Sequence, residues 1–326
     1  MPKTIRLIST TLAMNSVFKA QENKILLVTG ATGHTGTYFM KRLGREEYKG
    51  RIRCSVRTGS DLSFIENLGL DIEFKRGDLN EDSFANDCMR DVGNVIHIAG
   101  IHFSRKIARA AVANGVDCIV FVHTTGRYSQ FKSASADYVR IEDFVTQTGL
   151  PRVVLRPTMI YGSLRDKNIH QLIAYLDKHR VFPVFGKGTN LMQPIHARDL
   201  ADAIFQAWDM RERTINKEYN VAGRTAMKYL DLLKTVSAKL HRNTTFVKIP
   251  LTISLLAVYF YNALNPKAKI SVEQVMRMNE DKTFDYGDAE RDFGFRPMTF
   301  DEGVGEEVEE YRLMSKRTNG QTNPRR

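Results

Sequence analysis

The residues best suited to acid–base chemistry stand close together in the middle of the chain. Tyr128 precedes Lys132 by four positions and follows Thr124 by four. On a helix, the first spacing places a phenol and an ammonium group one turn apart on the same face. The phenol could then exchange a proton with a substrate oxygen, while the ammonium group stabilises its anion and the threonine binds the reacting oxygen. We therefore predict Thr124, Tyr128 and Lys132 as catalytic residues.

A glycine-rich turn between a strand and a helix predicts where a dinucleotide binds. Residues 24–36 read KILLVTGATGHTG, an apolar strand that runs directly into three glycines. The first glycine permits a sharp turn, the second lets the backbone approach a pyrophosphate, and the third lets the helix pack closely. N–H groups at the start of the helix then face the phosphates. Cofactor contacts are expected from Gly30, Thr32, Gly33, His34, Thr35 and Gly36.

The end of the second expected strand indicates which dinucleotide is bound. Residues 51–57 alternate as a strand and end in Arg57, where an NAD-selective site would carry an acidic residue for the ribose 2′-hydroxyl. An arginine can instead bind a 2′-phosphate with two hydrogen bonds. NADP(H) is therefore expected, with NAD(H) as the alternative if Arg57 is only a solvated charge.

The order of strand and helix patterns predicts the fold. Further strands are expected over residues 71–80, 94–100, 116–126 and 152–157, and helical patterns stand between them. Repeated strand–helix units of about 30 residues are typical of parallel sheets. We predict an α/β fold, a Rossmann-type doubly wound parallel sheet with a smaller C-terminal substrate-binding portion. His97 alternates within its strand and is expected to be a packed histidine, not a ligand.

Several motifs in sequence order resemble the extended and atypical families of the short-chain dehydrogenase/reductase superfamily, whose members include NAD(P)-dependent nucleotide-sugar epimerases and dehydratases. They are the G-x-x-G-x-x-G spacing, the RPTMIYG stretch at 156–162 and the IHARDL block at 195–200. The likeness covers about residues 24 to 311. It implies further cofactor contacts from Asp78, Leu79, Ala99, Gly100, Lys132 and Pro157, and substrate contacts from His102, Thr158, Tyr161, Gln193 and His196.

Alternative roles remain open for three of these residues. Asp78 could instead cap the helix that is expected to begin near Glu81. His196 is equally expected as a buried histidine bonded to a neighbouring loop. In the extended families a long loop separates the strand-end hydroxyl from the tyrosine, whereas Tyr128 follows Thr124 almost at once. Tyr138 is a competing phenol, although Glu142 stands where a lysine would follow it.

Composition limits the class of protein and its partners. The chain has 326 residues, of which 42% are hydrophobic and 26% charged, as in ordinary globular proteins. Its net charge of +11 comes without a zinc spacing or a basic motif interleaved with aromatic residues, so small anionic molecules are expected and nucleic acid is not. The three cysteines stand far apart, which predicts no disulfide framework, no metal site and a reducing, cytoplasmic environment.

The pattern along the chain also predicts its division. Residues 1–22 are expected to be a flexible extension, 23–165 the NAD(P)-binding core, and 313–326 a disordered tail. Residues 166–312 are expected to form a mixed substrate-binding portion, with a segment at about 190–225 returning to the core. The apolar run at 251–264 is shorter than the ~20 residues that span a bilayer. It is expected to cover a substrate pocket or to form a homodimer interface, and a role at a membrane surface is the weaker alternative.

Two classes of function follow. The first is an NADP(H)-dependent oxidoreductase or epimerase/dehydratase that acts on a nucleotide sugar or a similar small carbonyl or hydroxyl compound. The second is a non-catalytic NADP(H)-binding redox sensor or assembly protein, which the short connection before Tyr128 favours.

Overall fold

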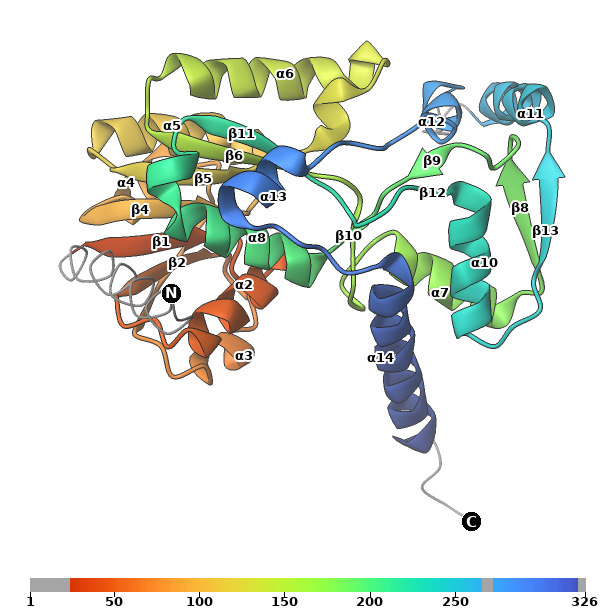
Figure 1. Ribbon diagram of the computed structural model, residues 1–326, viewed down its shortest axis with the longest axis horizontal. Helices are drawn as coiled ribbons and strands as arrows, with labels where there is room; N and C mark the ends of the chain where they lie inside the picture. The colour runs from red at the N-terminus through yellow and green to blue at the C-terminus, as the bar shows by residue number, and fades with distance from the viewer. Residues whose placement is uncertain (1–23, 266–271, 322–326) are drawn as a thin grey trace, which may run out of the picture. The chain divides into compact units, whose positions relative to one another are not determined.

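A seven-stranded sheet is the central element of the computed structural model, which describes residues 24–265 and 272–321 (Figure 1). The strands are β1 (Ile25–Thr29), β2 (Ile52–Val56), β3 (Ile72–Arg76), β4 (Val92–His97), β5 (Cys118–Val122), β6 (Arg152–Pro157) and β11 (Lys217–Val221). Their order is β11-β6-β5-β4-β1-β2-β3. The pairs β1–β2, β1–β4, β2–β3 and β4–β5 are all parallel. The predicted Rossmann-type doubly wound sheet is therefore confirmed.

The order of the strands reverses between β1 and β4. From β1 the chain proceeds outward through β2 and β3, and it then returns to place β4 on the other side of β1. In open α/β sheets, ligands bind outside the carboxyl ends of the strands at such a switch point. Two segments leave these strand ends, the glycine-rich turn after β1 and the residues Ala99 and Gly100 after β4.

The chain forms two compact units, and unit 1 comprises residues 1–123, 140–154 and 207–218. Helices lie between its strands: α2 (His34–Arg45), α3 (Ser63–Glu66), α4 (Asp82–Cys88), the short 3₁₀ helix η1 (Ile101–Phe103), α5 (Ser104–Ala113) and α9 (Arg211–Thr214). The helix α6 (Lys132–Gln147) begins in unit 2 and ends in unit 1. The core of unit 1 contains Leu27, Val95, Ile107 and Ile119, all fully buried. The repeated strand–helix pattern thus builds this unit, as the sequence predicts.

Unit 2 comprises residues 124–139, 155–206 and 219–326, and so alternates with unit 1 along the chain. Its helices are η2 (Thr125–Tyr128), α7 (Ile169–Lys178), most of α8 (Ala197–Asp209), α10 (Tyr229–Lys239), α11 (Leu251–Leu264), α12 (Val272–Arg277), α13 (Gly287–Phe293) and α14 (Phe300–Gln321). Short strands pair as β7 (Ile160–Tyr161) with β10 (Ile195–His196), β9 (Leu191–Met192) with β12 (Met227–Lys228), and β8 (Val181–Phe185) with β13 (Thr245–Ile249). Its core joins α7, α10 and α14 through Ile173, Leu233 and Val304.

The chain ends differ from the sequence-based expectation where they are described. Helix α14 continues to Gln321, so residues 313–321 are helical where a disordered tail was expected. The expected extension at 1–22 lies outside the described residues. The three cysteines are buried free thiols. Within residues 24–265 and 272–321, no helix is both long and apolar enough to cross a membrane.

Candidate functional site

The glycine-rich turn places its three glycines in different surroundings. Gly30 has a φ of 77°, and a Cβ there would lie 2.7 Å from the Ala99 nitrogen. A Cβ at Gly36 would lie only 2.0 Å from the Gly30 carbonyl oxygen. The fold itself therefore requires these two glycines. Gly33 is exposed, and among the described residues the atom near a Cβ there would be the Gly30 carbonyl oxygen, at 3.1 Å.

Helix α2 begins at this turn without a side-chain cap. Gly33 is its N-cap and, as a glycine, offers no side chain to cap the helix, and no acidic residue stands in the first turn. The Gly33 carbonyl accepts hydrogen bonds from the Thr37 nitrogen at 2.9 Å and from the Thr37 hydroxyl at 2.8 Å. The N–H groups of a helix's first turn have no partner within the helix and carry partial positive charge. This end of α2, with the exposed glycine Gly33, fits the pyrophosphate of a dinucleotide.

A buried histidine holds the turn after β4. His97 Nε2 lies 3.2 Å from the Gly100 carbonyl, which can only accept, so Nδ1 accepts from the Thr29 hydroxyl at 2.7 Å. Burial, with His123 nearby, lowers the pKa of His97 to about 3 and keeps the ring neutral. The backbone nitrogen of Ala99 donates to the same threonine oxygen at 3.4 Å. His97 is a packed histidine, as predicted, and it ties Ala99 and Gly100 to the end of β1.

The ends of β2 and β3 present two exposed arginines. Arg57 follows β2 and Arg76 ends β3, next to it in register, since Val56 pairs with Arg76. Neither guanidinium group has a hydrogen bond or an ion pair among the described residues. Asp78 accepts from the Asn80 backbone at 2.8 Å and does not cap α4, whose N-cap is Glu81. Sequence reasoning missed Arg76, for which the signal was a basic residue at a strand end.

The catalytic candidates do not share one helix, which corrects the expected geometry. Tyr128 ends the 3₁₀ helix η2, and Lys132 is the first residue of α6. Ser129 between them has extended backbone, with a ψ of 137°. The one-turn relation inferred from the Tyr-x-x-x-Lys spacing is therefore absent. Thr124 caps η2, because its hydroxyl accepts from the Gly126 nitrogen at 3.0 Å.

An arginine occupies the position expected for the lysine beside Tyr128. Arg156 Nη1 donates to the Tyr128 hydroxyl oxygen at 2.9 Å. The ring of Tyr128 also lies 5.4 Å from the ring of Phe284, and the side chain remains 44% exposed. Pro157, the next residue on β6, accepts a hydrogen bond from the Thr125 hydroxyl at 3.1 Å. This contact fastens η2 to the end of β6. No pattern in the sequence indicated Phe284.

Four of the expected substrate residues are buried in unit 2 and bonded to one another or to the backbone. Thr158 donates to the Gln193 carbonyl at 2.5 Å, while the Gln193 amide donates to Gly223 at 2.8 Å and accepts from Phe284 at 2.9 Å. Tyr161 and His196 pair in register on β7 and β10, with rings 5.2 Å apart. His102 is exposed on η1 of unit 1. The buried positions hold loops together, and a substrate role for them stays a prediction.

A buried Ser–His–Glu relay lies in unit 1 and was not expected from the sequence. The Ser104 hydroxyl is 3.1 Å from His123 Nε2, and Glu142 Oε1 is 3.1 Å from His123 Nδ1. The order matches that of a nucleophile, a base and an orienting carboxylate. Ser104 is fully buried at the start of α5, so no substrate can reach it. The relay is structural, and it accounts for Glu142 where a lysine would otherwise follow Tyr138.

Two buried carboxyl groups meet in unit 2. Glu307 on α14 accepts from the Gly162 nitrogen at 2.9 Å, and the Asp166 carboxylate lies beside it. Burial and the neighbouring negative charge raise the pKa of Glu307 to about 9. Asp166 in turn accepts from the backbone of Ile169 and His170 at 2.9 and 3.1 Å and so caps α7. The protonated form of Glu307 therefore stabilises the fold.

This pair predicts that unit 2 loses stability as the pH rises. The folded protein holds the Glu307 proton between about pH 4.5 and about pH 9, and the unfolded chain does not. The stabilisation by protonated Glu307 is complete below the pKa that this residue has in the unfolded chain. It is lost as the pH rises toward 9. Glu307→Gln should flatten the decline in the free energy of unfolding by up to about 1.4 kcal/mol per pH unit. Urea unfolding at several pH values tests this. The exposed control Glu309→Gln should behave as the parent, and an unchanged slope for Glu307→Gln would contradict the assignment.

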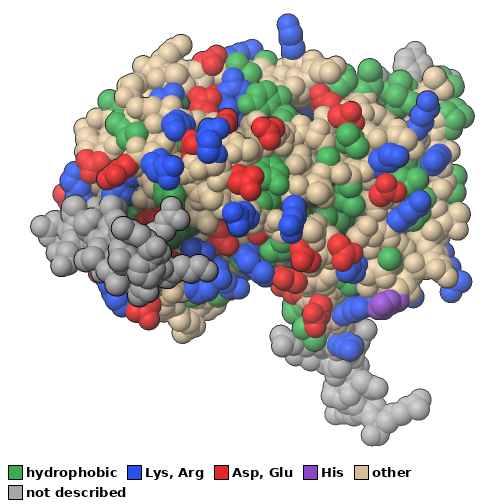
Figure 2. Space-filling model, in the orientation of Figure 1, with side chains coloured by type: hydrophobic (Ala, Val, Ile, Leu, Met, Phe, Trp, Pro, Cys, Tyr) green, Lys and Arg blue, Asp and Glu red, His purple; other side chains and the backbone are tan. Residues whose placement is uncertain are grey.

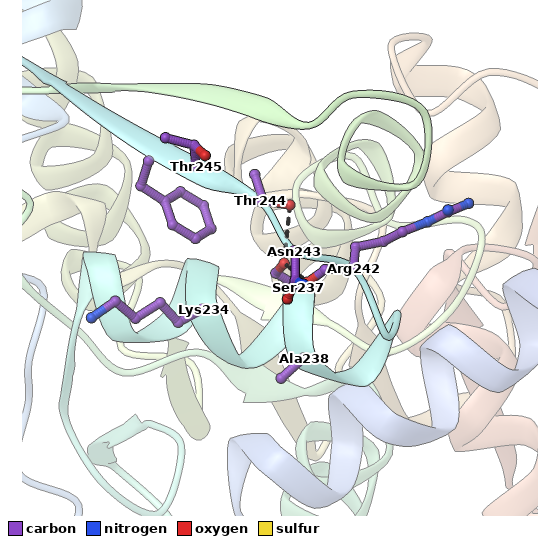
Figure 3. A pocket seen from close by; sticks show the side chains of 8 residues that line it. Lys234, Ser237, Ala238, Arg242, Asn243, Thr244 and Thr245 are labelled. Atoms are coloured by element: carbon purple, nitrogen blue, oxygen red, sulfur yellow. Dashed lines mark hydrogen bonds between the residues drawn. The ribbon is translucent and has the colours of Figure 1, made fainter.

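A basic cavity of about 350 Å³ beside the end of α10 is not a convincing ligand site (Figure 3). Ser237 donates to the Arg242 carbonyl at 2.8 Å and bonds the Thr244 hydroxyl at 3.0 Å. Arg242 points away from the cavity and pairs with Asp177 at 2.8 Å. These groups satisfy one another and close the turn after α10. Among the described residues, no group of three His, Cys, Asp or Glu side chains could hold a metal ion.

Comparison with known proteins finds a family model that part of the chain matches. Residues 119–222, from β5 to the end of β11, match the model of the NAD dependent epimerase/dehydratase family. The resemblance to the short-chain dehydrogenase/reductase superfamily is confirmed. The matched segment is shorter than half the chain, and it includes η2, α6 and the RPTMIYG stretch.

Curated proteins and solved structures match the chain at low identity. The chain is 23% identical over 254 residues to NADH dehydrogenase (ubiquinone) 1 alpha subcomplex subunit 9, a mitochondrial protein of Arabidopsis thaliana; the alignment covers 71% of this chain and 61% of that protein. UDP-glucose 4-epimerase of Thermotoga maritima, solved with UDP-glucose, has a TM-score of 0.68 at 16% identity, covering 89% and 99% of the two chains. A double mutant of the dTDP-glucose 4,6-dehydratase DesIV of Streptomyces venezuelae, solved with NAD, has a TM-score of 0.67 at 19% identity, covering 88% and 96%. These structural likenesses show the fold.

Proposed function

We propose that the protein is an NAD(P)-dependent oxidoreductase or epimerase/dehydratase acting on a nucleotide sugar or a similar small carbonyl or hydroxyl compound. The observation that carries this proposal is the exposed glycine Gly33 at the start of α2, a helix end without a capping side chain at the sheet's switch point. The family match of residues 119–222 supports the enzyme class. The nucleotide-sugar enzymes among the structural neighbours support the substrate class.

Different residues of the chain would bind the cofactor and transfer the proton. The N–H groups at the start of α2 would bind the pyrophosphate, and Ala99 and Gly100 would let the nicotinamide ribose approach closely. When bound, the dinucleotide would supply the hydride-transfer chemistry. Tyr128 would move a proton to or from the substrate oxygen, with the Arg156 guanidinium bonded to its hydroxyl. Thr124 would donate a hydrogen bond to the same substrate oxygen, and Lys132 would bind the ribose hydroxyls.

We expect NADPH to bind more tightly than NADH by roughly tenfold or more, ~1.4 kcal/mol, because Arg57 is exposed and available to a 2′-phosphate. Arg57→Ala should remove most of this preference in fluorescence titrations with the two nucleotides. Arg51→Ala, at the opposite end of β2, is the matched control and should keep it. Equal affinities in the parent protein would show that Arg57 does not read the phosphate.

A non-catalytic NADP(H)-binding protein is the second candidate. The separation of Tyr128 and Lys132 into different elements favours it, as does the match to a subunit of mitochondrial NADH dehydrogenase. A turnover screen of sugar nucleotides, quinones and simple carbonyls with NADPH and NADH separates the two candidates. Nucleotide binding without turnover of any substrate would favour the second.

A further inference from the structure

Helix α11 exposes an apolar face to solvent. Its 14 residues, LTISLLAVYFYNAL, include no charged side chain. Ile253, Leu256 and Tyr261 are 56%, 55% and 49% exposed, and Ala257 is exposed beside them. Spacings of three, four and eight residues place all four on one side of the helix. The expectations that this segment covers a substrate pocket or forms a homodimer interface stay predictions; Leu251 and Thr252 at its start line a cavity.

The opposite face of α11 carries both polar and apolar side chains. Ser254 is buried and donates to the Pro250 carbonyl at 3.2 Å. Asn262, two turns further on, is half-buried, as are Leu255 and Val258. A surface helix of a water-soluble protein turns its polar side chains outward and its apolar ones inward. In α11 the exposed side is instead mainly apolar, with Thr252 as its polar exception, which suits a helix whose outer face meets an apolar medium.

The strand pair β8–β13 of unit 2 also exposes apolar side chains. In the parallel pair β8–β13, Thr245 lies opposite Val181, Val247 opposite Pro183, and Ile249 opposite Phe185. Residues two apart on a strand share a face, so these six side chains lie on one side of the pair. Val181, Phe185 and Val247 are among the exposed large hydrophobic residues. Contiguous exposed apolar surface of this kind marks interaction sites.

Two lysines lie near the start of α11. Lys187 and Lys248 are exposed and line a cavity of about 720 Å³ together with Pro250, Leu251 and Asp281. Neither ammonium group has a hydrogen bond or ion pair among the described residues, whereas the Asp281 carboxylate accepts from the Leu191 nitrogen at 2.7 Å. In sequence, Lys267 and Lys269 follow the helix closely. Figure 2 shows hydrophobic and basic side chains side by side over this end of unit 2.

We propose that α11 lies in the plane of a membrane surface that contains anionic lipids, with its apolar face in the headgroup region. A 14-residue helix is about 21 Å long, too short for the ~30 Å hydrocarbon core, and apolar runs of this length are found at interfaces. Lysines beside such a helix bind lipid phosphates. Charge decides between a membrane and a second copy of the chain. In a symmetric dimer this face would meet itself and bring like charges together, whereas anionic lipids neutralise them.

Cosedimentation of the full chain with vesicles tests the proposal. Vesicles of phosphatidylcholine and phosphatidylglycerol at a molar ratio of about three to one should bind the protein. Pure phosphatidylcholine should bind it about tenfold more weakly, and added salt should weaken the binding to anionic vesicles. Leu256→Glu should reduce this binding about tenfold or more, because it places a charge in the inserted face. Val112→Glu changes an equally exposed apolar residue on α5 of unit 1 and should bind as the parent.

A tryptophan variant tests whether α11 itself enters the membrane surface. The emission of Leu256→Trp should shift to the blue when anionic vesicles are added, since the indole leaves water. The proposal is overturned if neither binding nor a shift occurs. It is also overturned if light scattering shows a dimer that Leu256→Glu dissociates while vesicles leave the protein unbound, because α11 is then an interface between copies.

Discussion

Gly33→Val is expected to abolish dinucleotide binding and to leave the protein folded. Among the described residues, a Cβ at this position would meet only the Gly30 carbonyl oxygen, at 3.1 Å, so a small adjustment of the turn accommodates it. The rest of the side chain would then fill the space beside the start of α2 where the pyrophosphate is proposed to lie. Titration with NADPH, alongside circular dichroism of the same samples, measures both outcomes.

Two other glycines of α2 make the result specific. Gly44→Val is the matched control, because a Cβ there makes only ordinary contacts, the nearest at 3.7 Å; this variant should bind as the parent. Gly36→Val should instead lose its fold, since its Cβ would lie 2.0 Å from the Gly30 oxygen. If Gly33→Val bound NADPH with parental affinity, the turn after β1 would not be the nucleotide site.

Tyr128→Phe is expected to lower kcat by ~10²-fold or more while NADPH affinity stays nearly unchanged. The substitution removes the hydroxyl that the Arg156 guanidinium holds at 2.9 Å, and with it the proposed proton donor and acceptor. Loss of a positioned acid or base has effects of this size. Because the ring remains, its contact with Phe284 is retained, and the loss reports the hydroxyl.

Variants of Tyr138 and Lys132, measured in parallel, test which tyrosine is the acid and which cation acts on it. Tyr138→Phe should leave turnover near the parental rate; turnover that survives in Tyr128→Phe and falls in Tyr138→Phe would reassign the acid. Lys132→Met should weaken cofactor binding and turnover together if the lysine serves both. If Lys132→Met weakens cofactor binding alone, Arg156 and not Lys132 is the cation that acts on the Tyr128 phenol. That result would agree with the separate elements that hold Tyr128 and Lys132.

The parts of the structure that sequence predicted are those where neighbouring residues decide the outcome. Strands β1 and β5 are apolar runs and β2 and β3 alternate, and such patterns have few other solutions. The requirement for glycine at Gly30 and Gly36 could be predicted, because a turn with positive φ and a closely packed helix leave no space for a side chain. His97 alternated with its strand and is buried where that alternation placed it.

The segment around Tyr128 shows what local reasoning could not supply. Ser129 donates to Glu280 at 3.0 Å, and the Gln130 nitrogen donates to the same carboxylate at 2.8 Å. A residue 150 positions away thus holds the connection between η2 and α6 in an open form. The Tyr-x-x-x-Lys spacing does not predict this contact with Glu280. Long-range hydrogen bonds override local helix propensity in this way.

Three further features depended on packing that no pattern revealed. Gln193 and Thr158 resembled substrate contacts in sequence, yet their side chains bond buried backbone groups. An all-apolar helix such as α11 has no polar side by which its outward face could be recognised in advance. Arg156 was visible only as part of a motif, because its partner Tyr128 lies 28 positions earlier in the chain.

Titration of the purified parent protein with NADPH and NADH tests the central claim most directly. The open turn at Gly33 and the uncapped start of α2 predict saturable binding of one dinucleotide per chain, with NADPH bound more tightly. Saturation at one equivalent, competed by added NADP⁺, is the result expected. Absence of binding by either nucleotide, from a protein whose circular dichroism shows it folded, would contradict the account.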